Sequence, residues 1–391
     1  MKILITTDWY EPAVNGVVAS VKALAEGLQN QGHEVRILTL SQNHSTMVNG
    51  NVTRIGSIGI GKIYPNARLR IVPARRTVQD LIDWQPDIVH SQCEFSTFLI
   101  ARHIARSCGV PLLHTYHTVY EDYTHYFAPG KKIGKFTAAW FSRGILALTD
   151  RIVVPTEKTR KLLYGYKVRK PICVIPSGLN LERFCVKRPE LERDALRKSL
   201  GFSEHDLVLV NLGRLAKEKN TEEILRYFAE KNGRISEKLK LLIVGDGPDR
   251  AALQKLSAEL GISDRVTFTG MVDPEDVGAY YRAADLFVSA SQSETQGLTY
   301  IEAMACGLPL LCREDPCLNG VLSDGVTGFS YTQEEGFQKA LNVFIKNPQR
   351  RIDMGKHAEA AARGKWSKEA FAAAVEKEYR AAIRDEEKAA G

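Results

Sequence analysis

The sequence lacks the long apolar stretch that a membrane-spanning helix requires. Nowhere in its 391 residues is there a run approaching the roughly 20 consecutive apolar residues of such a helix. The N-terminal segment turns polar after Ile3, Leu4 and Ile5, which is too short for the apolar core of a secretory signal. We therefore expect a cytoplasmic protein that does not span a membrane.

Patterns that indicate disulfides or bound metal are also missing. The seven cysteines are odd in number and include no Cys-x-x-Cys pair. Cys312 and Cys317 are the closest two in sequence, and no nearby histidine completes a zinc set. No Asp-x-Asp occurs, which argues against a diphosphate held through a metal on two carboxylates. We expect reduced thiols and no metal.

Charge is distributed unevenly along the chain. Residues 1–180 hold 22 Lys and Arg against 12 Asp and Glu, a net charge of +10, whereas residues 181–391 hold 31 against 34, a net of −3. A basic half beside a nearly neutral half indicates that only the first half meets an anionic surface. No helix-turn-helix, zinc-finger or RNA-recognition motif is present, so we expect no nucleic-acid partner.

Apolar strand patterns alternate with helical patterns, which predicts two α/β domains with parallel sheets. Residues 176–205 interrupt the alternation with a Pro-Ser-Gly turn and a charged stretch, and we interpret them as the interdomain linker. The end of the chain is helical and charged. We therefore expect an N-terminal domain over 1–176, a C-terminal domain over 177–365, and a terminal helix over 366–391 that packs back on the first domain. Strands are expected at 2–7, 34–40, 88–90, 111–116, 151–154, 172–175, 207–212, 239–244, 266–269, 286–289 and 308–311.

The strongest functional pattern surrounds Glu294 and Glu302, which are eight positions apart. We expect both on or beside one helix whose free N-terminal amides suit an anion, while the carboxylates accept hydrogen bonds from sugar hydroxyls. The alternative is a solvated helix with two unrelated acids. The expected caps are Ser293 or Thr295, and the expected ligand-binding positions between the acids are Thr295, Gln296, Gly297 and Leu298.

Two further strand-to-helix loops have the composition of phosphate-binding loops. Gly213, Arg214 and Lys219 follow an apolar strand, where an arginine fork and a lysine point charge suit a diphosphate. Asn15 and Gly16 lie between the first strand and the first helix, where this pair allows a positive φ and the close approach of a phosphate or an acceptor. The alternatives are exposed surface charge and an ordinary tight turn.

Two weaker candidates also follow strands. Gly247, in the turn Gly-Asp-Gly-Pro, suits a nucleotide or an ordinary tight turn equally well. His117 falls at the end of an apolar strand, in a loop rich in His, Tyr and acidic residues, and we expect it to bind sugar or take part in catalysis. His114, inside the strand, is expected to be structural.

A basic amphipathic segment spans residues 131–151. Aromatic and aliphatic residues alternate there with cations, as in helices that lie in a membrane interface. Each cation near anionic lipid contributes roughly 1 kcal/mol of attraction. The alternative is a core-facing helix with a solvated basic edge. The candidate membrane and acceptor residues are Lys131, Lys132, Lys135, Phe136, Trp140 and Arg143.

Together these motifs resemble the retaining glycosyltransferases of family 4, over nearly the whole chain. The resemblance implies a GT-B fold, with two Rossmann-like doubly wound domains facing across a cleft. It implies that Arg214 and Lys219 bind the diphosphate of a nucleotide-sugar, Glu294 and the following amides hold the sugar, and Glu302 binds the ribose. Gly16 approaches the phosphates and His117 lies near the reacting sugar.

HTYHTVYEDYTHY, SQCEFS and SETQGLTYIEAMACGLPL further resemble the bacterial 1,2-diacylglycerol 3-α-glucosyltransferases. This implies transfer of glucose from UDP-glucose to diacylglycerol by a peripheral protein on the inner face of the cell membrane. Other open readings are a family 4 enzyme with a soluble or different lipid acceptor, and a nucleotide-sugar epimerase or sensor on the same fold.

Overall fold

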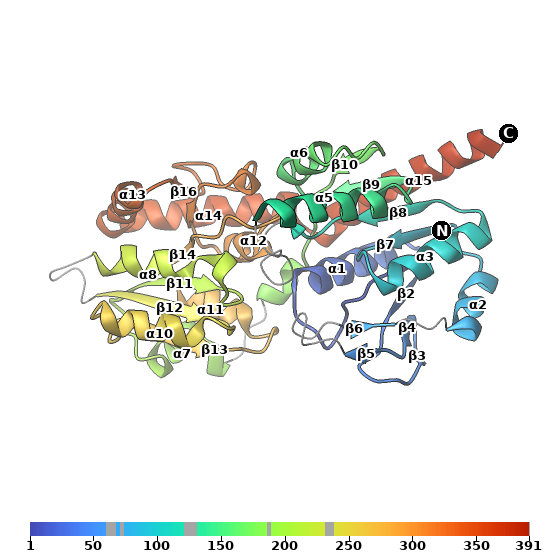
Figure 1. The fold of residues 1–391 in the computed structure, drawn as a ribbon. Helices are drawn as coiled ribbons and strands as arrows, with labels where there is room; N and C mark the ends of the chain where they lie inside the picture. The colour runs from blue at the N-terminus through green and yellow to red at the C-terminus, as the bar shows by residue number, and fades with distance from the viewer. Residues whose placement is uncertain (60–67, 71–73, 121–130, 186–188, 231–237, 391) are drawn as a thin grey trace. The chain divides into compact units, whose positions relative to one another are not determined.

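A computed structural model of the chain describes residues 1–59, 68–70, 74–120, 131–185, 189–230 and 238–390. The chain divides into two units, and each is described by itself (Figure 1). Unit 1 comprises Met1–Leu179 and Lys368–Gly391, and unit 2 comprises Asn180–Ser367.

Unit 1 is built on an eight-stranded sheet with the order β10-β9-β8-β7-β1-β2-β4-β3. All neighbouring strands are parallel except β3, which runs antiparallel to β4. A separate two-stranded sheet pairs β5 (Ile58–Gly59) with β6 (Arg68–Leu69). The strands of the large sheet are β1 (Lys2–Thr6), β2 (Glu34–Leu40), β3 (Met47–Asn49), β4 (Val52–Ile55), β7 (Ile88–Ser91), β8 (Leu112–Thr115), β9 (Arg151–Val154) and β10 (Ile172–Val174).

Helices cover both faces of this sheet, which explains its nearly continuous apolar strands. Ile3 and Ile5 pack with α1 and α15 on one face, whereas Leu4 packs with α2 and α3 on the other. The opposite directions follow from the two-residue period of a strand. The helices of unit 1 are α1 (Gly16–Asn30), α2 (Arg75–Asp83), α3 (Ser96–Cys108), α5 (Lys131–Leu146), α6 (Glu157–Gly165) and α15 (Lys368–Ala390).

The terminal helix α15 is part of the core of unit 1. Gly27 of α1 lies so close to it that a Cβ there would be 2.6 Å from the Lys368 carbonyl oxygen. Phe371 and Val375 are buried against α1, and burial of each side chain contributes about 1.5–3 kcal/mol. The hydroxyl of Tyr379 hydrogen-bonds Nδ1 of His90 in β7 at 2.7 Å.

Unit 2 has a six-stranded sheet in the order β13-β12-β11-β14-β15-β16, with every pair parallel. Its strands are β11 (Leu207–Leu212), β12 (Leu239–Val244), β13 (Val266–Gly270), β14 (Leu286–Ser289), β15 (Leu310–Arg313) and β16 (Gly328–Tyr331). Its helices are α7 (Arg193–Ser199), α8 (Thr221–Ala229), α10 (Arg250–Glu259), α11 (Val277–Ala283), α12 (Leu298–Ala305), α13 (Glu334–Lys346) and α14 (Pro348–Lys365).

The helices of unit 2 also lie on both faces of their sheet. Leu209 and Ile243 pack into one cluster with α8, α10 and α13. On the other face, Phe287 of β14 contacts the rings of Tyr281 in α11 and Tyr300 in α12. The prediction of two doubly wound α/β units is therefore confirmed.

The linker predicted for residues 176–205 is wrong over most of its length. The 3-10 helix η2 (Leu181–Cys185) and α7 lie inside unit 2 and pack on α11. Arg193 and Arg197, which look solvated in the sequence, both donate to the carboxylate of Asp285. Charge in this segment therefore marks tertiary ion pairs and not an exposed connection.

Three strands of the large sheets were not predicted from the sequence patterns. β3 has only three residues, β4 has four and includes Arg54, and β16 begins with Gly328. A short strand that contains a charge or a glycine lacks the apolar run by which we recognised the others.

Candidate functional site

The strand order of each unit points to one ligand-binding edge. In unit 2 the chain runs from β11 through β12 to β13 and then returns to the other side of β11 as β14. In unit 1 the same reversal falls between β1 and β7. Ligands of open α/β sheets bind at the carboxyl ends of the strands beside such a reversal. In unit 2 these ends lead into the loops 213–220 and 290–297.

The loop after β11 places its cations beside acidic partners. Gly213 has a φ of 147° and turns the chain out of the strand. The guanidinium of Arg214 pairs with the carboxylate of Glu218, four residues later in the same loop. Nζ of Lys219 donates to Oε1 of Glu294 at 2.5 Å. The structure therefore brings together Lys219 and Glu294, which are 75 residues apart in the chain.

The loop after β14 leads into α12 through Gly297. This residue is the N-cap, with a φ of 72°, and a Cβ on it would lie 2.4 Å from the ring of Tyr300. The predicted caps, Ser293 and Thr295, are therefore wrong, because the helix begins at Leu298. The hydroxyl of Ser293 instead donates to the carbonyl oxygen of Glu218 at 3.3 Å, which ties the two loops together.

Glu294 and Glu302 lie on either side of the start of α12, as predicted. Glu294 lies in the loop before α12, and Glu302 lies within the helix and is buried. Oε1 of Glu302 accepts from Arg183 at 2.8 Å, and Oε2 accepts from the Tyr281 hydroxyl at 3.0 Å. Burial raises the pKa of Glu302, while Arg183 and Tyr281 oppose the rise. The two acids therefore have separate partners.

Gly247 packs against the backbone of the loop that carries Arg214. A Cβ on Gly247 would lie 2.2 Å from the carbonyl oxygen of Leu215. The amide of Leu215 in turn donates to the carbonyl of Asp246 at 2.9 Å. This close packing explains why residue 247 is a glycine. A contact of Gly247 with a nucleotide remains a proposal.

In unit 1, Asn15 acts as the N-cap of α1. Its Oδ1 accepts from the amide of Val18 at 3.0 Å, and Gly16 is the first helical residue. The φ of Asn15 is −161°, so the positive φ that the Asn-Gly pair allows is not adopted at this residue. Capping geometry, with an extended N-cap residue, takes precedence over the turn that an Asn-Gly pair suggests.

His117 follows β8 and is held by a neutral partner. Its Nε2 donates to Oε1 of Gln92 at 2.8 Å. Burial, with a smaller effect from His114, lowers the pKa of His117 to about 3. The ring is therefore uncharged near neutral pH, so it suits hydrogen bonding and not general acid catalysis.

His114 is structural, as expected. It is fully buried in β8, with Nδ1 at 3.2 Å from the Ser91 hydroxyl and Nε2 at 3.3 Å from Glu94. The other oxygen of Glu94 accepts from the Tyr120 hydroxyl at 2.5 Å. This network lies at the carboxyl end of β7 and β8, beside His117.

Sequence reasoning missed several partners of these residues. Glu218 is four positions after Arg214, a spacing that signals a helical ion pair. Gln92 and Arg183 gave no comparable signal, because their partners, His117 and Glu302, are distant in sequence.

The helix α5 is amphipathic in the way that its sequence indicates. Ala138, Ser142 and Leu146 are buried, whereas Phe136 and Trp140 are 73% and 66% exposed. Lys135 and Arg143 are also exposed. The side chains of Lys131 and Lys132 lie outside what the structure describes. Searched over the described residues, no helix is both long and apolar enough to cross a membrane.

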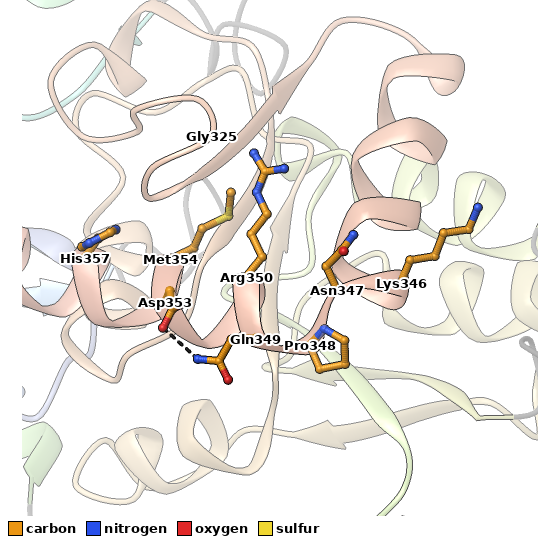
Figure 2. A pocket seen from close by; sticks show the side chains of 9 residues that line it. All are labelled: Gly325, Lys346, Asn347, Pro348, Gln349, Arg350, Asp353, Met354 and His357. Carbon is orange, nitrogen blue, oxygen red and sulfur yellow. Dashed lines mark hydrogen bonds between the residues drawn. The ribbon is translucent and has the colours of Figure 1, made fainter.

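Two further observations concern a pocket without an assigned role and possible metal ligands. A hollow of about 630 Å³ lies where α13 meets α14, and it contains none of the predicted site residues (Figure 2). In the described parts of the chain, no three His, Cys, Asp or Glu side chains are placed to hold a metal ion. The expectation that no metal is required stays a prediction.

Two protein families match consecutive parts of the chain. Residues 14–183 match the family described as Glycosyltransferase Family 4, and residues 192–361 match the one described as Glycosyl transferases group 1. The chain is 37% identical to the alpha-monoglucosyldiacylglycerol synthase of Streptococcus pneumoniae, covering 98% of this chain and 86% of that protein. It is 32% identical to the protein of the same name from Acholeplasma laidlawii, covering 97% and 96%.

A solved structure gives the same fold. The crystal structure of HepE from Anabaena in complex with UDP aligns with a TM-score of 0.76 at 16% identity, covering 97% of this chain and all of that one. At this identity the likeness concerns the fold, and it agrees with the two Rossmann-like units described above.

Proposed function

Because the chain belongs to the family 4 glycosyltransferases, we propose that it transfers glucose from UDP-glucose to 1,2-diacylglycerol, with retention of the α configuration, at a membrane surface. The chain is a hexosyltransferase. The similarity to two alpha-monoglucosyldiacylglycerol synthases over nearly the full length is the observation that supports the identity of the acceptor and of the sugar.

The two loops at the carboxyl edge of unit 2 support a nucleotide-sugar donor. Arg214 presents a planar fork and Lys219 a point charge, and both are suited to a diphosphate. Glu294 lies next to Lys219, so a sugar whose hydroxyls donate hydrogen bonds to this carboxylate would lie beside its own diphosphate. The amides of residues 295–298 complete the sugar site, and Glu302 is assigned to the ribose.

The reaction follows from these charges. The acceptor hydroxyl attacks the anomeric carbon from the face that UDP leaves, forming the new C–O bond as the bond to the diphosphate breaks. The leaving phosphate oxygen takes the proton of the hydroxyl. Arg214 and Lys219 stabilise the negative charge that develops on the diphosphate. Neutral His117 hydrogen-bonds the sugar and does not donate a proton.

The exposed face of α5 supports a membrane acceptor. Phe136 and Trp140 point away from the core, and Lys135 and Arg143 are exposed on the same helix. Aromatic side chains among cations suit the interface of an anionic bilayer. We assign peripheral attachment at the inner face of the cell membrane to this helix.

The direct test is product analysis. The protein is incubated with vesicles that contain diacylglycerol and with either UDP-glucose or UDP-galactose. The expected product is an α-glucosyl lipid, identified by its mass and by the proton coupling of its anomeric carbon. Lipid that gains no hexose, gains only galactose, or carries a β linkage would contradict the proposal.

A further inference from the structure

The helix α3 carries an exposed stripe that the core of unit 1 does not explain. Leu99 is 61% exposed, and its neighbour one turn earlier, Phe95, is 47% exposed. His103 and Arg106 continue the same face at helical spacing and are exposed too. The opposite face of α3 is buried against the sheet through Phe98, Ala101, Ile104 and Ala105.

This stripe meets α5 through aromatic contacts. The ring of Phe95 stacks on that of Phe141 in α5, with centroids 5.7 Å apart. Tyr120 contacts both rings edge-on, at 6.3 Å from Phe95 and 5.6 Å from Phe141. The exposed aromatic residues of α5, Phe136 and Trp140, therefore belong to a helix that packs directly on the start of α3.

The charge of the two helices is of one sign. Neither α3 nor α5 contains an Asp or Glu. Arg106 on α3 and Lys135 and Arg143 on α5 are exposed. Apolar side chains on two helices that carry cations and no acids complement a surface of anionic headgroups over acyl chains. A bilayer offers both complements, since its anionic headgroups meet the cations and its acyl chains accommodate Leu99 and Trp140.

We propose that Phe95, Leu99 and Arg106 of α3 form a second membrane-contacting arm beside α5, so that unit 1 meets an anionic bilayer through two helices. We call this surface the α3–α5 face. The inference rests on the proposed function, because the bilayer that this face contacts is also the source of the lipid acceptor. Phe95 follows β7 closely, so the bilayer contact adjoins the carboxyl edge where His117 and Glu94 lie in the same unit.

Vesicle binding by matched variants tests the α3–α5 face. Leu99→Ser removes an exposed side chain from the stripe, and Val48→Ser removes one that is 67% exposed on β3 of the same unit. With phosphatidylglycerol vesicles, we expect Leu99→Ser to bind about tenfold more weakly than wild type, since an apolar side chain no longer enters the bilayer. Val48→Ser should stay within about twofold, and Leu99→Trp should bind at least as tightly as wild type.

Salt dependence provides a second, independent readout. Arg106→Gln should weaken binding to the same vesicles by about fivefold at low ionic strength, and the difference should fade at high salt. Wild-type affinity for Leu99→Ser, or equal losses for Leu99→Ser and Val48→Ser, would overturn the α3–α5 face.

Activity on two forms of the acceptor separates this inference from the proposed function. Leu99→Ser should match wild type on a short-chain diacylglycerol dissolved as monomers and should lose most activity on diacylglycerol in vesicles. If wild type glucosylates neither form while Leu99→Ser still binds vesicles weakly, the acceptor assignment fails and the face stands. If wild type glucosylates diacylglycerol and Leu99→Ser is equally active on vesicles, the function stands and the face fails.

Discussion

The two units present chemically different groups at the carboxyl ends of strands in similar sheets. At the carboxyl ends of β11 and β14, unit 2 places ion pairs, Lys219 with Glu294 and Arg214 with Glu218. At the carboxyl ends of β7 and β8, unit 1 places His117 against the amide of Gln92. Topology thus selects the position of a site, and the side chains select its ligand. The proposed function assigns the anionic donor to unit 2 and the uncharged alcohol to unit 1.

Burial reinforces this difference. In unit 1, burial lowers the pKa of His117 to about 3 and raises the pKa of Asp8 to about 6, so both groups are pushed toward their neutral forms. His90 is shifted in the same direction as His117, again by burial. Burial therefore disfavours the charged forms of these three groups in unit 1, whereas the loops of unit 2 hold Lys219 and Glu294 as an ion pair.

The largest expected effect comes from removing the cations of unit 2. Arg214→Ala and Lys219→Ala should each lower turnover with UDP-glucose by about a hundredfold, because one donor to the developing charge contributes about 3 kcal/mol. Lys217→Ala, an exposed lysine in the same loop, is the control and should remain close to wild type. Initial rates at saturating acceptor measure the change. Near-normal rates for Arg214→Ala or Lys219→Ala would show that this cation does not stabilise the diphosphate, and the contrast between the units would be wrong.

A smaller effect is expected from the acid that holds Arg214. Glu218→Gln keeps the shape of the side chain but loses the charge that orients the guanidinium. Turnover should fall by about tenfold, less than for Arg214→Ala, because the cation itself remains. Glu222→Gln, which breaks an exposed pair with Arg226, is the matched control. Equal rates for the two Gln variants would show that Glu218 does not position Arg214.

The smallest effect concerns stability in unit 1. Since the folded pKa of His117 is about 3, the unfolded chain binds a proton below about pH 6.5 that the folded protein excludes. The stability that neutral His117 contributes is present above that pH and is lost as the pH falls toward 3. At pH 5 this loss amounts to about 1–2 kcal/mol.

Denaturant unfolding between pH 4.5 and 7.5 measures this loss. His117→Asn should show a shallower fall in the free energy of unfolding than wild type as the solution is acidified. Parallel curves for the two proteins would mean that His117 is not kept neutral by burial.

The sequence predicted which strands lead into the candidate residues but not how their side chains pair. Arg214, Lys219 and Glu294 follow apolar strands, and parallel strands bring such loops to one edge. Gln92 and Arg183 were missed because their partners are set by tertiary packing, which no local pattern encodes. The charged residues around Arg193 were assigned to a linker for the same reason, because no local pattern in the sequence indicates the ion pair between Arg193 and Asp285.

Calorimetric titration with UDP tests most directly whether unit 2 holds the donor. Wild-type protein should bind one UDP per chain, and the affinity should fall by about tenfold or more in Arg214→Ala and in Lys219→Ala, with Lys217→Ala unchanged. Absence of UDP binding by wild type, or equal affinity in all four proteins, would contradict the account.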